Sequence, residues 1–470
     1  MSAQAVPAPP RPAPALAGGK LARPPRLGSV PWLLVACLAV GAVSLLTVSA
    51  PTYDPWAWII WGREVLHGDL VTIEGPSWKP LPVLFTTPFA VFGDDTAPAL
   101  WLVVARAGGL LALGMAYRLG ARLAGEWAGA IAAASLLLAD EFVRDFARGN
   151  SEGLLVALVL WAVDRHLDGR RSQAFLLGFG AALLRPEVWP FWGLYGLWLV
   201  YQAWDGVPWR ELALVAGLGV LTLLLWFVPE YLGSSDWLRA AARARDPNPG
   251  AATFAQSPFL EVFHRSAAKL SVPVYVGGLL GTAIALWRRN HVQIALAAMA
   301  TLLMVEVAAM TEGGFAGNLR YVALPAALVC VLAGAGWVQT VRAAGRWAPL
   351  VALLAVAAAI PFVAADVRAA RDDRALTVEE SNFYGPNLKA VIAKAGGRAR
   401  IKSCGRVFSG PFEVPSVAWR LHLHLNEVAI FAFGPGATVA LASTHVSEDP
   451  RWPAIARTHT WIVGSSCGRR

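Results

Sequence analysis

Apolar stretches of membrane-spanning length recur between Val30 and Val367, and they constrain the fold more than any other feature of the chain. Each is roughly 17 to 25 residues long, the length that an α-helix needs to cross a hydrocarbon core of about 30 Å. The composition agrees, because 56% of the residues are hydrophobic and only 15% are charged. Strand-like alternation is absent from these stretches, so their part of the chain is predicted to be that of an all-α polytopic membrane protein. We expect about eleven spans, near residues 30–50, 97–119, 126–139, 151–167, 172–185, 188–204, 210–229, 272–287, 291–310, 320–338 and 348–366.

The net charge of +9 is distributed in a way that predicts orientation. Basic residues precede the first span and then gather in alternate connections, which the positive-inside rule assigns to the cytoplasm. This placement excludes a nucleic-acid partner as the reason for the charge. We expect a multi-pass protein of a bacterial plasma membrane, with residues 1–29 as a disordered cytoplasmic tail and the first span kept as an anchor. The basic residues are Lys20, Arg23, Arg26, Arg118, Arg122, Arg165, Arg170, Arg171, Arg210, Arg288, Arg289, Arg342 and Arg346.

An odd number of spans that starts inside places the C-terminus outside. Residues 367–470 change to a polar character with short strand-like runs, which predicts a small extracytoplasmic α/β domain. In an outside location Cys404 and Cys467 are expected to form a disulfide, while Cys37 and Cys330 lie in spans as buried thiols. Residues 30–366 form the predicted membrane module, whose outer loops 51–96 and 231–270 are longer than connectors need to be. The outer face is therefore where we expect the functional site.

The first outer loop places an acid beside a predicted surface helix. Apolar residues recur at helical spacing between Asp54 and His67, which favours an amphipathic helix at the membrane interface. Asp54 can be an N-cap there, with Pro55 at the first helical position. Lys79, followed by Pro80, comes 25 residues after the acid at the start of another apolar stretch. An acid and a cation are thus expected to flank the same helix.

These residues resemble the first outer loop of membrane glycosyltransferases of the GT-C superfamily, closest to the aminoarabinose-transferase and protein O-mannosyltransferase branch. The resemblance rests on Asp54, the helix end "REVLHGDL" and the "KPLPVLFTTPFAVFG" that begins at Lys79. "GNLRYVALPAALVCVLAG", from Gly317 to Gly334, is similar to the opening of a late span in such enzymes. The order of spans over residues 30–340 agrees with it. The branch usually has Asp-Glu, whereas here Pro55 follows the acid.

The resemblance implies transfer of a hexose or pentose from a polyprenyl-phosphate-linked sugar donor to a glycan, lipid or protein acceptor at the outer face. It implies that Asp54 is the catalytic base and that Lys79 binds the donor phosphate. General chemistry asks for the same groups: a sugar hydroxyl needs a carboxylate to take its proton, and the leaving phosphate needs a cation in a site of low dielectric. A single attack of this kind inverts the anomeric centre. No phosphate-binding fingerprint for a nucleotide is present in the sequence.

Other charges in apolar surroundings are candidates for the same site. Arg185 and Arg320 are predicted to contact the donor phosphate, since charges within spans are costly unless they are paired or functional. Mutual pairing of Arg185 with Glu187, and salt bridges at helix ends around Asp140 and Glu141, are the structural alternatives. The sugar or acceptor pocket is predicted to include Trp56, Trp78, Asp140, Glu141, Glu187 and Tyr321.

His422 and His424 in "RLHLHLNE" are expected on one face of a strand. They lack the further ligands that zinc requires, so we assign no metal site, although a divalent cation remains a possible cofactor. Two other functions are open at this point. A transporter or lipid flippase would line a pathway with the intramembrane charges, and it would be expected to have two similar halves. A non-catalytic membrane scaffold with an outer binding domain would leave the Asp54 and Lys79 arrangement without a purpose.

Overall fold

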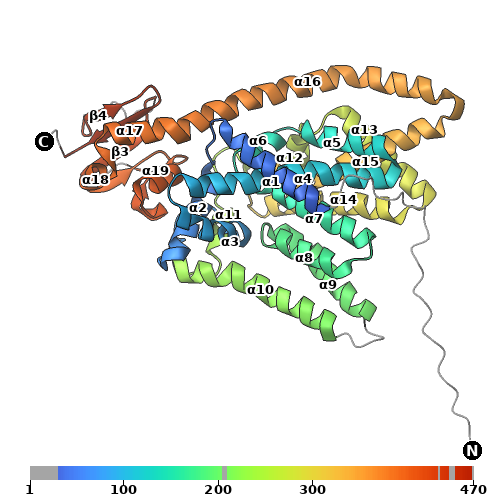
Figure 1. The fold of residues 1–470 in the computed structure, drawn as a ribbon, viewed down its shortest axis with the longest axis horizontal. Helices are drawn as coiled ribbons and strands as arrows, with labels where there is room; N and C mark the ends of the chain where they lie inside the picture. The colour runs from blue at the N-terminus through green and yellow to red at the C-terminus, as the bar shows by residue number, and fades with distance from the viewer. Residues whose placement is uncertain (1–29, 204–208, 432–433, 444–449, 468–470) are drawn as a thin grey trace, which may run out of the picture.

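The computed structural model describes residues 30–203, 209–431, 434–443 and 450–467. The predicted tail at residues 1–29, with Lys20, Arg23 and Arg26, lies outside the described residues. The described chain is mainly helical and elongated, with a small sheet at one end (Figure 1).

A helix occupies each of the predicted spans, although several are shorter than expected. Five helices are long and apolar enough to cross a membrane by length and composition, among them α4, α10, α14 and the segments that contain α15 and α16. The chain is thus built for several crossings, and the total of about eleven stays a prediction. The helices are α1 (Val30–Val43), α4 (Thr96–Ala124), α5 (Glu126–Leu137), α7 (Glu152–Leu167), α8 (Arg171–Ala182), α9 (Trp189–Ala203), α10 (Trp209–Ser234), α13 (Val272–Arg288), α14 (His291–Glu312), α15 (Ala323–Ala343) and α16 (Ala348–Asn382).

Small residues allow the central helices to approach closely. A Cβ atom on Gly153 of α7 would lie 2.7 Å from the Cα atom of Gly109 on α4. A Cβ atom on Gly336 of α15 would lie 2.1 Å from the carbonyl oxygen of Gly277 on α13. Membrane helices associate through such close packing, because lipid tails are as apolar as their side chains. Substitution of either glycine would force two helices apart.

At the C-terminal end of α4, three arginines surround the carboxylate of Asp164. Arg118 and Arg122 lie 2.9 and 2.6 Å from Asp164 Oδ1, and Arg165 lies 2.6 Å from Asp164 Oδ2. Asp164 is fully buried. Arg118 and Arg122, which are among the basic residues that predict a cytoplasmic connection, therefore form ion pairs between α4 and α7.

The first outer loop folds into α2 (Tyr53–His67) and α3 (Pro80–Phe89). The expectation of a surface helix is wrong for α2, because residues from Trp56 to Trp61 are at most 2% exposed. Helix α2 lies between α3, α4 and the C-terminal domain, and Trp58 and Trp101 meet edge to face at 5.7 Å. The N-cap of α2 is Thr52, so the prediction that Asp54 caps this helix is also wrong.

The second long outer loop begins later than predicted, since α10 continues to Ser234. Ser235 then adopts a left-handed conformation with φ of 61°. The loop contains α11 (Arg239–Ala244) and α12 (Pro258–Ser266). Arg239 donates hydrogen bonds to the carbonyl oxygens of Ile73, Gly75 and Pro76. This connects α11 to the segment that leads to Lys79.

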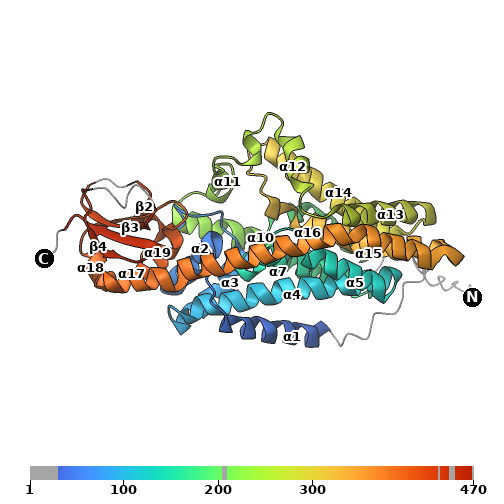
Figure 2. The same ribbon diagram turned by 90° about the horizontal axis from the view of Figure 1, so that it is seen from above.

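Helix α16 joins the membrane module to the C-terminal domain and runs along the length of the molecule (Figures 1 and 2). It continues through the domain boundary that we expect at residue 367 and ends at Asn382. Its polar half contacts α6 (Phe142–Ala147), since Arg148 Nη1 lies 2.5 Å from Glu380 Oε2. Arg144 pairs with Glu141, Asp373 and Glu380, and not with Asp140 as its spacing suggests.

The C-terminal domain contains a five-stranded mixed sheet with the order β2-β1-β3-β5-β4. Strand β1 is parallel to β2 and β3, whereas β5 is antiparallel to β3 and β4. The predicted α/β character of this domain is confirmed. Its elements are α17 (Leu388–Lys394), α18 (Gly397–Lys402), β1 (Arg406–Phe408), α19 (Val414–Leu421), β2 (Val428–Ala429), β3 (Gly436–Leu441), β4 (Ala454–Arg457) and β5 (Trp461–Ser465).

Two expectations for this domain differ from the structure. His422 ends α19 with a φ of 55°, so His422 and His424 do not lie on a strand. Both histidines bind acids of the first outer loop, with His422 Nε2 2.7 Å from Asp94 and His424 Nδ1 2.8 Å from Glu64. No disulfide joins Cys404 to Cys467 in the structure, and Cys404 Sγ accepts a hydrogen bond of 3.0 Å from Ser465 Oγ.

The C-terminal domain is docked on the membrane module through two adjacent acids. Asp94 pairs with Arg398 as well as His422, and Asp95 pairs with Lys389 and Arg420 at 2.7 Å each. Trp419 Nε1 also donates to the carbonyl oxygen of Asp94. Apolar residues of α2 and of the C-terminal domain belong to one continuous buried cluster. The domain therefore holds α2 from the side that faces away from the membrane helices.

Candidate active site

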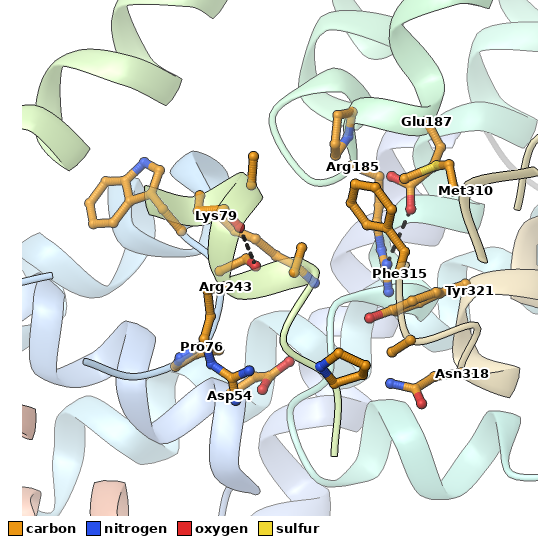
Figure 3. Close-up of a pocket in the computed structure, with 18 of the residues that line it drawn as sticks. Asp54, Pro76, Lys79, Arg185, Glu187, Arg243, Met310, Phe315, Asn318 and Tyr321 are labelled. Atoms are coloured by element: carbon orange, nitrogen blue, oxygen red, sulfur yellow. Dashed lines mark hydrogen bonds and ion pairs between the residues drawn. The ribbon is translucent and has the colours of Figure 1, made fainter. Parts of the chain in front are cut away.

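A cavity of about 420 Å³ lies where the first outer loop, the α8–α9 turn, the 235–248 loop and the start of α15 meet (Figure 3). These four segments are far apart in sequence. Polar residues from all four line this one cavity. Of the predicted site residues, those that line the cavity are Asp54, Trp78, Lys79, Arg185, Glu187, Arg320 and Tyr321.

Asp54 lies in the first turn of α2 and reaches the cavity from below in the view of Figure 3. Its Oδ2 atom is 2.8 Å from Nη1 of Arg320. Only 12% of the Asp54 side chain is exposed, so the charge-assisted pair lies in a mostly dry environment. Arg320 belongs to the 3₁₀ turn Leu319–Val322 that opens α15, and this turn carries its side chain into the same cavity.

Lys79 precedes α3, where the helix begins with Pro80. Its ammonium donates a hydrogen bond of 3.2 Å to Ser151 Oγ and lies 4.9 Å from the centroid of the Trp58 ring. Burial, and then the charge of Arg185, lower the pKa of Lys79 to about 7. A buried cation that donates to a neutral hydroxyl gains strongly from an incoming anion.

Arg185 lies in the turn between α8 and the 3₁₀ helix Pro186–Val188. It pairs with the fully buried Glu152 and, at 3.5 Å, with Glu187. Its guanidinium also lies 4.3 Å from the centroid of the Tyr321 ring. The pairing of Arg185 with Glu187, which the sequence leaves as the structural alternative, is thus present, and Glu152 is an additional partner.

The arrangement provides a cationic region with a carboxylate at its border. Lys79, Arg185 and Arg320 all line one cavity, and hydrogen bonds from such groups to phosphate oxygens are short and strong. Apolar side chains form another part of the wall, including Trp189, Trp226 and Phe227. The cavity is therefore suited to an amphiphilic ligand with an anionic head.

Three residues that we predict for the sugar or acceptor pocket lie elsewhere. Trp56 is buried against Trp419 of the C-terminal domain, at a centroid distance of 6.3 Å. The Asp140 amide donates to the carbonyl oxygen of Lys269, and Glu141 pairs with Arg144. None of the three is among the described residues that line the cavity. Helix burial in α2 and salt bridging near α6 account for their positions.

Several residues of the site are not among those predicted from the sequence. Glu152 follows the turn "ARGNS" at the start of an apolar helix, so a buried acid before a span is the signal that identifies it. Arg243, in the basic run after α10, lies beside Asp54 and Pro76 in Figure 3. Asn318, two residues before the predicted Arg-Tyr pair, also lines the cavity. Loop residues such as Arg243 have no sequence pattern that predicts which way the loop folds.

Among the described residues, no group of three or more His, Cys, Asp or Glu side chains is placed to hold a metal ion. A divalent cation at this site accordingly stays a prediction from the sequence. The cations that face the cavity are side chains of the protein itself.

Comparisons with known proteins identify the fold. No family model matches the chain, and no curated protein matches it in sequence. Solved structures match over most of its length. ArnT from Cupriavidus metallidurans, with bound undecaprenyl phosphate, has a TM-score of 0.55 and 14% identity over 94% of this chain and 100% of that one. The same protein in its apo state gives a TM-score of 0.56 and 15% identity, over 94% and 99% of the two chains.

A second match is the oligosaccharyltransferase AglB from Archaeoglobus fulgidus, in complex with an inhibitory peptide and a dolichol-phosphate. It has a TM-score of 0.50 and 12% identity over 88% of this chain and 69% of that one. ArnT and AglB are both GT-C glycosyltransferases. The fold predicted from the first outer loop is therefore confirmed: this chain has the GT-C fold.

Proposed function

We propose that the protein is an inverting glycosyltransferase that moves a sugar from a polyprenyl-phosphate donor to an acceptor hydroxyl at the outer face of the membrane. The observation that carries the proposal is the meeting of Asp54 with Lys79, Arg185 and Arg320 in one cavity. The GT-C fold supports it, as does the undecaprenyl phosphate bound to ArnT and the dolichol-phosphate bound to AglB.

The donor phosphate binds Lys79, Arg185 and Arg320. Its prenyl chain follows the apolar wall near Trp189 and Trp226, which line the same cavity. The acceptor hydroxyl approaches from the side of Asp54 and Arg243. Tyr321 and Glu187, which both lie beside Arg185, contact the sugar. The positions of these residues around one cavity support this division.

In the transfer step the acceptor oxygen attacks the anomeric carbon and forms the new glycosidic bond. The bond from this carbon to the phosphate oxygen breaks, and its electron pair remains on the phosphate. The acceptor proton passes to the Asp54 carboxylate as the new bond forms. The three cations stabilise the charge that develops on the leaving phosphate, which is the larger effect in a site of low dielectric.

Transfer by the purified protein tests this proposal. Undecaprenyl-phosphate-linked hexoses and pentoses, each radiolabelled in the sugar, are incubated with the protein and a membrane fraction that supplies acceptors. The product linkage is assigned by NMR. We expect transfer from one class of donor, release of undecaprenyl phosphate, and an inverted anomeric configuration. Retention of configuration would exclude the single displacement, and absence of transfer from every donor would contradict the proposed activity.

A further inference from the structure

The turn between α6 and α7, residues 148–151, contacts both sides of the proposed site. On one side the Arg148 carbonyl oxygen accepts a hydrogen bond of 3.0 Å from the Thr52 amide. Asn150 Oδ1 accepts a second, of 3.1 Å, from Thr52 Oγ1. Thr52 is the N-cap of α2, two residues before Asp54. The start of the helix that carries Asp54 is thus bound through two atoms of one residue.

On the other side the same turn holds Lys79. Ser151 Oγ accepts the hydrogen bond of 3.2 Å from Lys79 Nζ, and Ser151 is only 1% exposed. Asn150 and Ser151 are adjacent in sequence and point to different elements, one to the N-cap of α2 and one to the residue before α3. The spacing between Asp54 and Lys79 therefore depends on one dipeptide.

The turn is rigidly supported. Gly149 has a φ of 90°, and a Cβ atom there would lie 3.2 Å from Pro55 Cβ and 3.2 Å from Trp101 Nε1. Trp101 Nε1 in turn donates a hydrogen bond of 2.9 Å to the Gly149 carbonyl oxygen. Asn150 donates from Nδ2 to Asp145 Oδ1 at 3.1 Å and from its amide to the Asp145 carbonyl oxygen at 3.0 Å. These two hydrogen bonds to Asp145 therefore fix the position of Asn150 independently of its contact with Thr52.

We propose that Asn150 and Ser151 are positioning residues for the transfer reaction, with Asn150 setting the place of Asp54 through Thr52 and Ser151 setting the place of Lys79. The proposal rests on the proposed function. The two residues are expected to affect different kinetic quantities. Asp54 acts on the acceptor in the chemical step, so Asn150 affects kcat, whereas Lys79 binds the donor phosphate, so Ser151 affects the Kd. A base displaced by about 1 Å lowers the rate on the order of 100-fold. Loss of the Ser151 hydroxyl, which accepts the hydrogen bond from Lys79, weakens binding of the sugar donor instead.

Matched variants test the separation. Thr52→Val removes the hydroxyl and keeps the shape, whereas Thr52→Ser keeps the hydroxyl. We expect Thr52→Val to lower kcat roughly 10- to 100-fold with the Kd for undecaprenyl phosphate unchanged, and Thr52→Ser to recover most of that rate. Asn150→Ala should lower kcat at least as much, because it removes the side-chain hydrogen bonds to both Thr52 and Asp145. Adding Thr52→Val to Asn150→Ala should lose little more, since the hydrogen bond between the two side chains is then already absent. Ser151→Ala should raise the Kd about 5- to 10-fold with kcat within about twofold, and Ser151→Thr should restore binding.

The outcomes distinguish this inference from the proposed function. If the wild type transfers sugar and Thr52→Val and Ser151→Ala match it in both kcat and Kd, the positioning roles are wrong while the glycosyltransferase activity stands. Equal loss of kcat in Thr52→Val and Thr52→Ser would also contradict the role of the hydroxyl. If the wild type transfers nothing, the proposed function itself fails, and the inference fails with it. The melting temperature of each variant in detergent confirms that the fold is kept.

Discussion

Arg320 lies 2.8 Å from Asp54, so the residue that we propose as the base is ion-paired with a residue that we propose as a phosphate ligand. While the pair is intact, the guanidinium holds the carboxylate through a charge-assisted hydrogen bond. A phosphate that enters the cavity competes with Asp54 for Arg320 and thereby makes the carboxylate available to the acceptor. Donor binding and activation of the base are coupled through one side chain.

The buried pair of Arg185 and Glu152 gives a prediction about stability and binding together. Arg185→Gln leaves Glu152 as a buried charge that has lost a partner, which costs about 3–5 kcal/mol. We expect a clear fall in the melting temperature in detergent and a Kd for undecaprenyl phosphate raised about tenfold or more. Adding Glu152→Gln should recover most of the stability but not the binding. A double variant that is no more stable than Arg185→Gln would contradict the pairing.

The pH dependence of donor binding should report Lys79. Its pKa of about 7 is far below the ordinary value of a lysine. Facing it are Asp54 from α2, Glu152 from α7, Arg185 from the turn after α8 and Arg320 from the turn before α15. A bound phosphate needs Lys79 in its charged form. Above pH 7 binding therefore requires uptake of a proton, and the Kd should rise by up to about tenfold for each pH unit.

Isothermal titration with an undecaprenyl phosphodiester between pH 6 and 9 measures this dependence, because a phosphodiester does not itself change charge over that range. Lys79→Arg provides the control, since arginine stays charged throughout. We expect a flat profile for Lys79→Arg above pH 7. A wild-type Kd that does not change with pH over this range would contradict the assignment of Lys79 as a phosphate ligand that titrates near neutrality.

Docking of the C-terminal domain should depend on Asp94 and Asp95. Burial alone would raise the pKa of Asp94, but hydrogen bonds from His422 and Arg398 lower it below its ordinary value. Hydrogen bonds from Lys389 and Arg420 lower the pKa of Asp95. Both acids therefore favour the docked state in their charged forms, and this contribution is lost only as the pH falls through these lowered values. At neutral pH it is fully present.

The double variant Asp94→Asn with Asp95→Asn removes both charges at neutral pH. We expect faster hydrogen exchange in α19 and faster proteolysis between α16 and α17, because α19 carries Trp419, Arg420 and the contact to Asp94. Asp372→Asn, at an exposed acid of α16, is the matched control. Exchange in α19 that equals that of the control would show that apolar packing alone holds the domain.

The sequence predicts much of this architecture, and the physical reason is the bilayer. The length of an apolar run indicates a helix, so helices are found at every expected span. Arg185 and Arg320 are recognisable because charges are rare in apolar surroundings. Asp54 and Lys79 are identified through the resemblance of the first outer loop to that of GT-C enzymes. All four line the same cavity.

What the sequence does not predict depends on how the loops fold. The amphipathic pattern of α2 indicates an interface helix, yet the C-terminal domain covers the face that would otherwise meet water. For the same reason Trp56 is a packing residue against Trp419 and does not reach the cavity. His422 and His424 follow an alternating pattern that favours a strand, but α19 ends there and the two side chains bind acids of another loop. Such tertiary contacts override local pattern.

Replacement of Asp54 tests the central claim most directly. The single-turnover rate of sugar transfer and the Kd for undecaprenyl phosphate are measured on the same preparations of wild type and Asp54→Asn. Glu74→Gln, at an exposed acid of the same outer loop, is the control. We predict that Asp54→Asn transfers sugar at least about 100-fold more slowly. It should bind undecaprenyl phosphate as tightly as the wild type or more tightly, because Arg320 no longer has a competing carboxylate. A variant that transfers sugar at the wild-type rate would contradict the account.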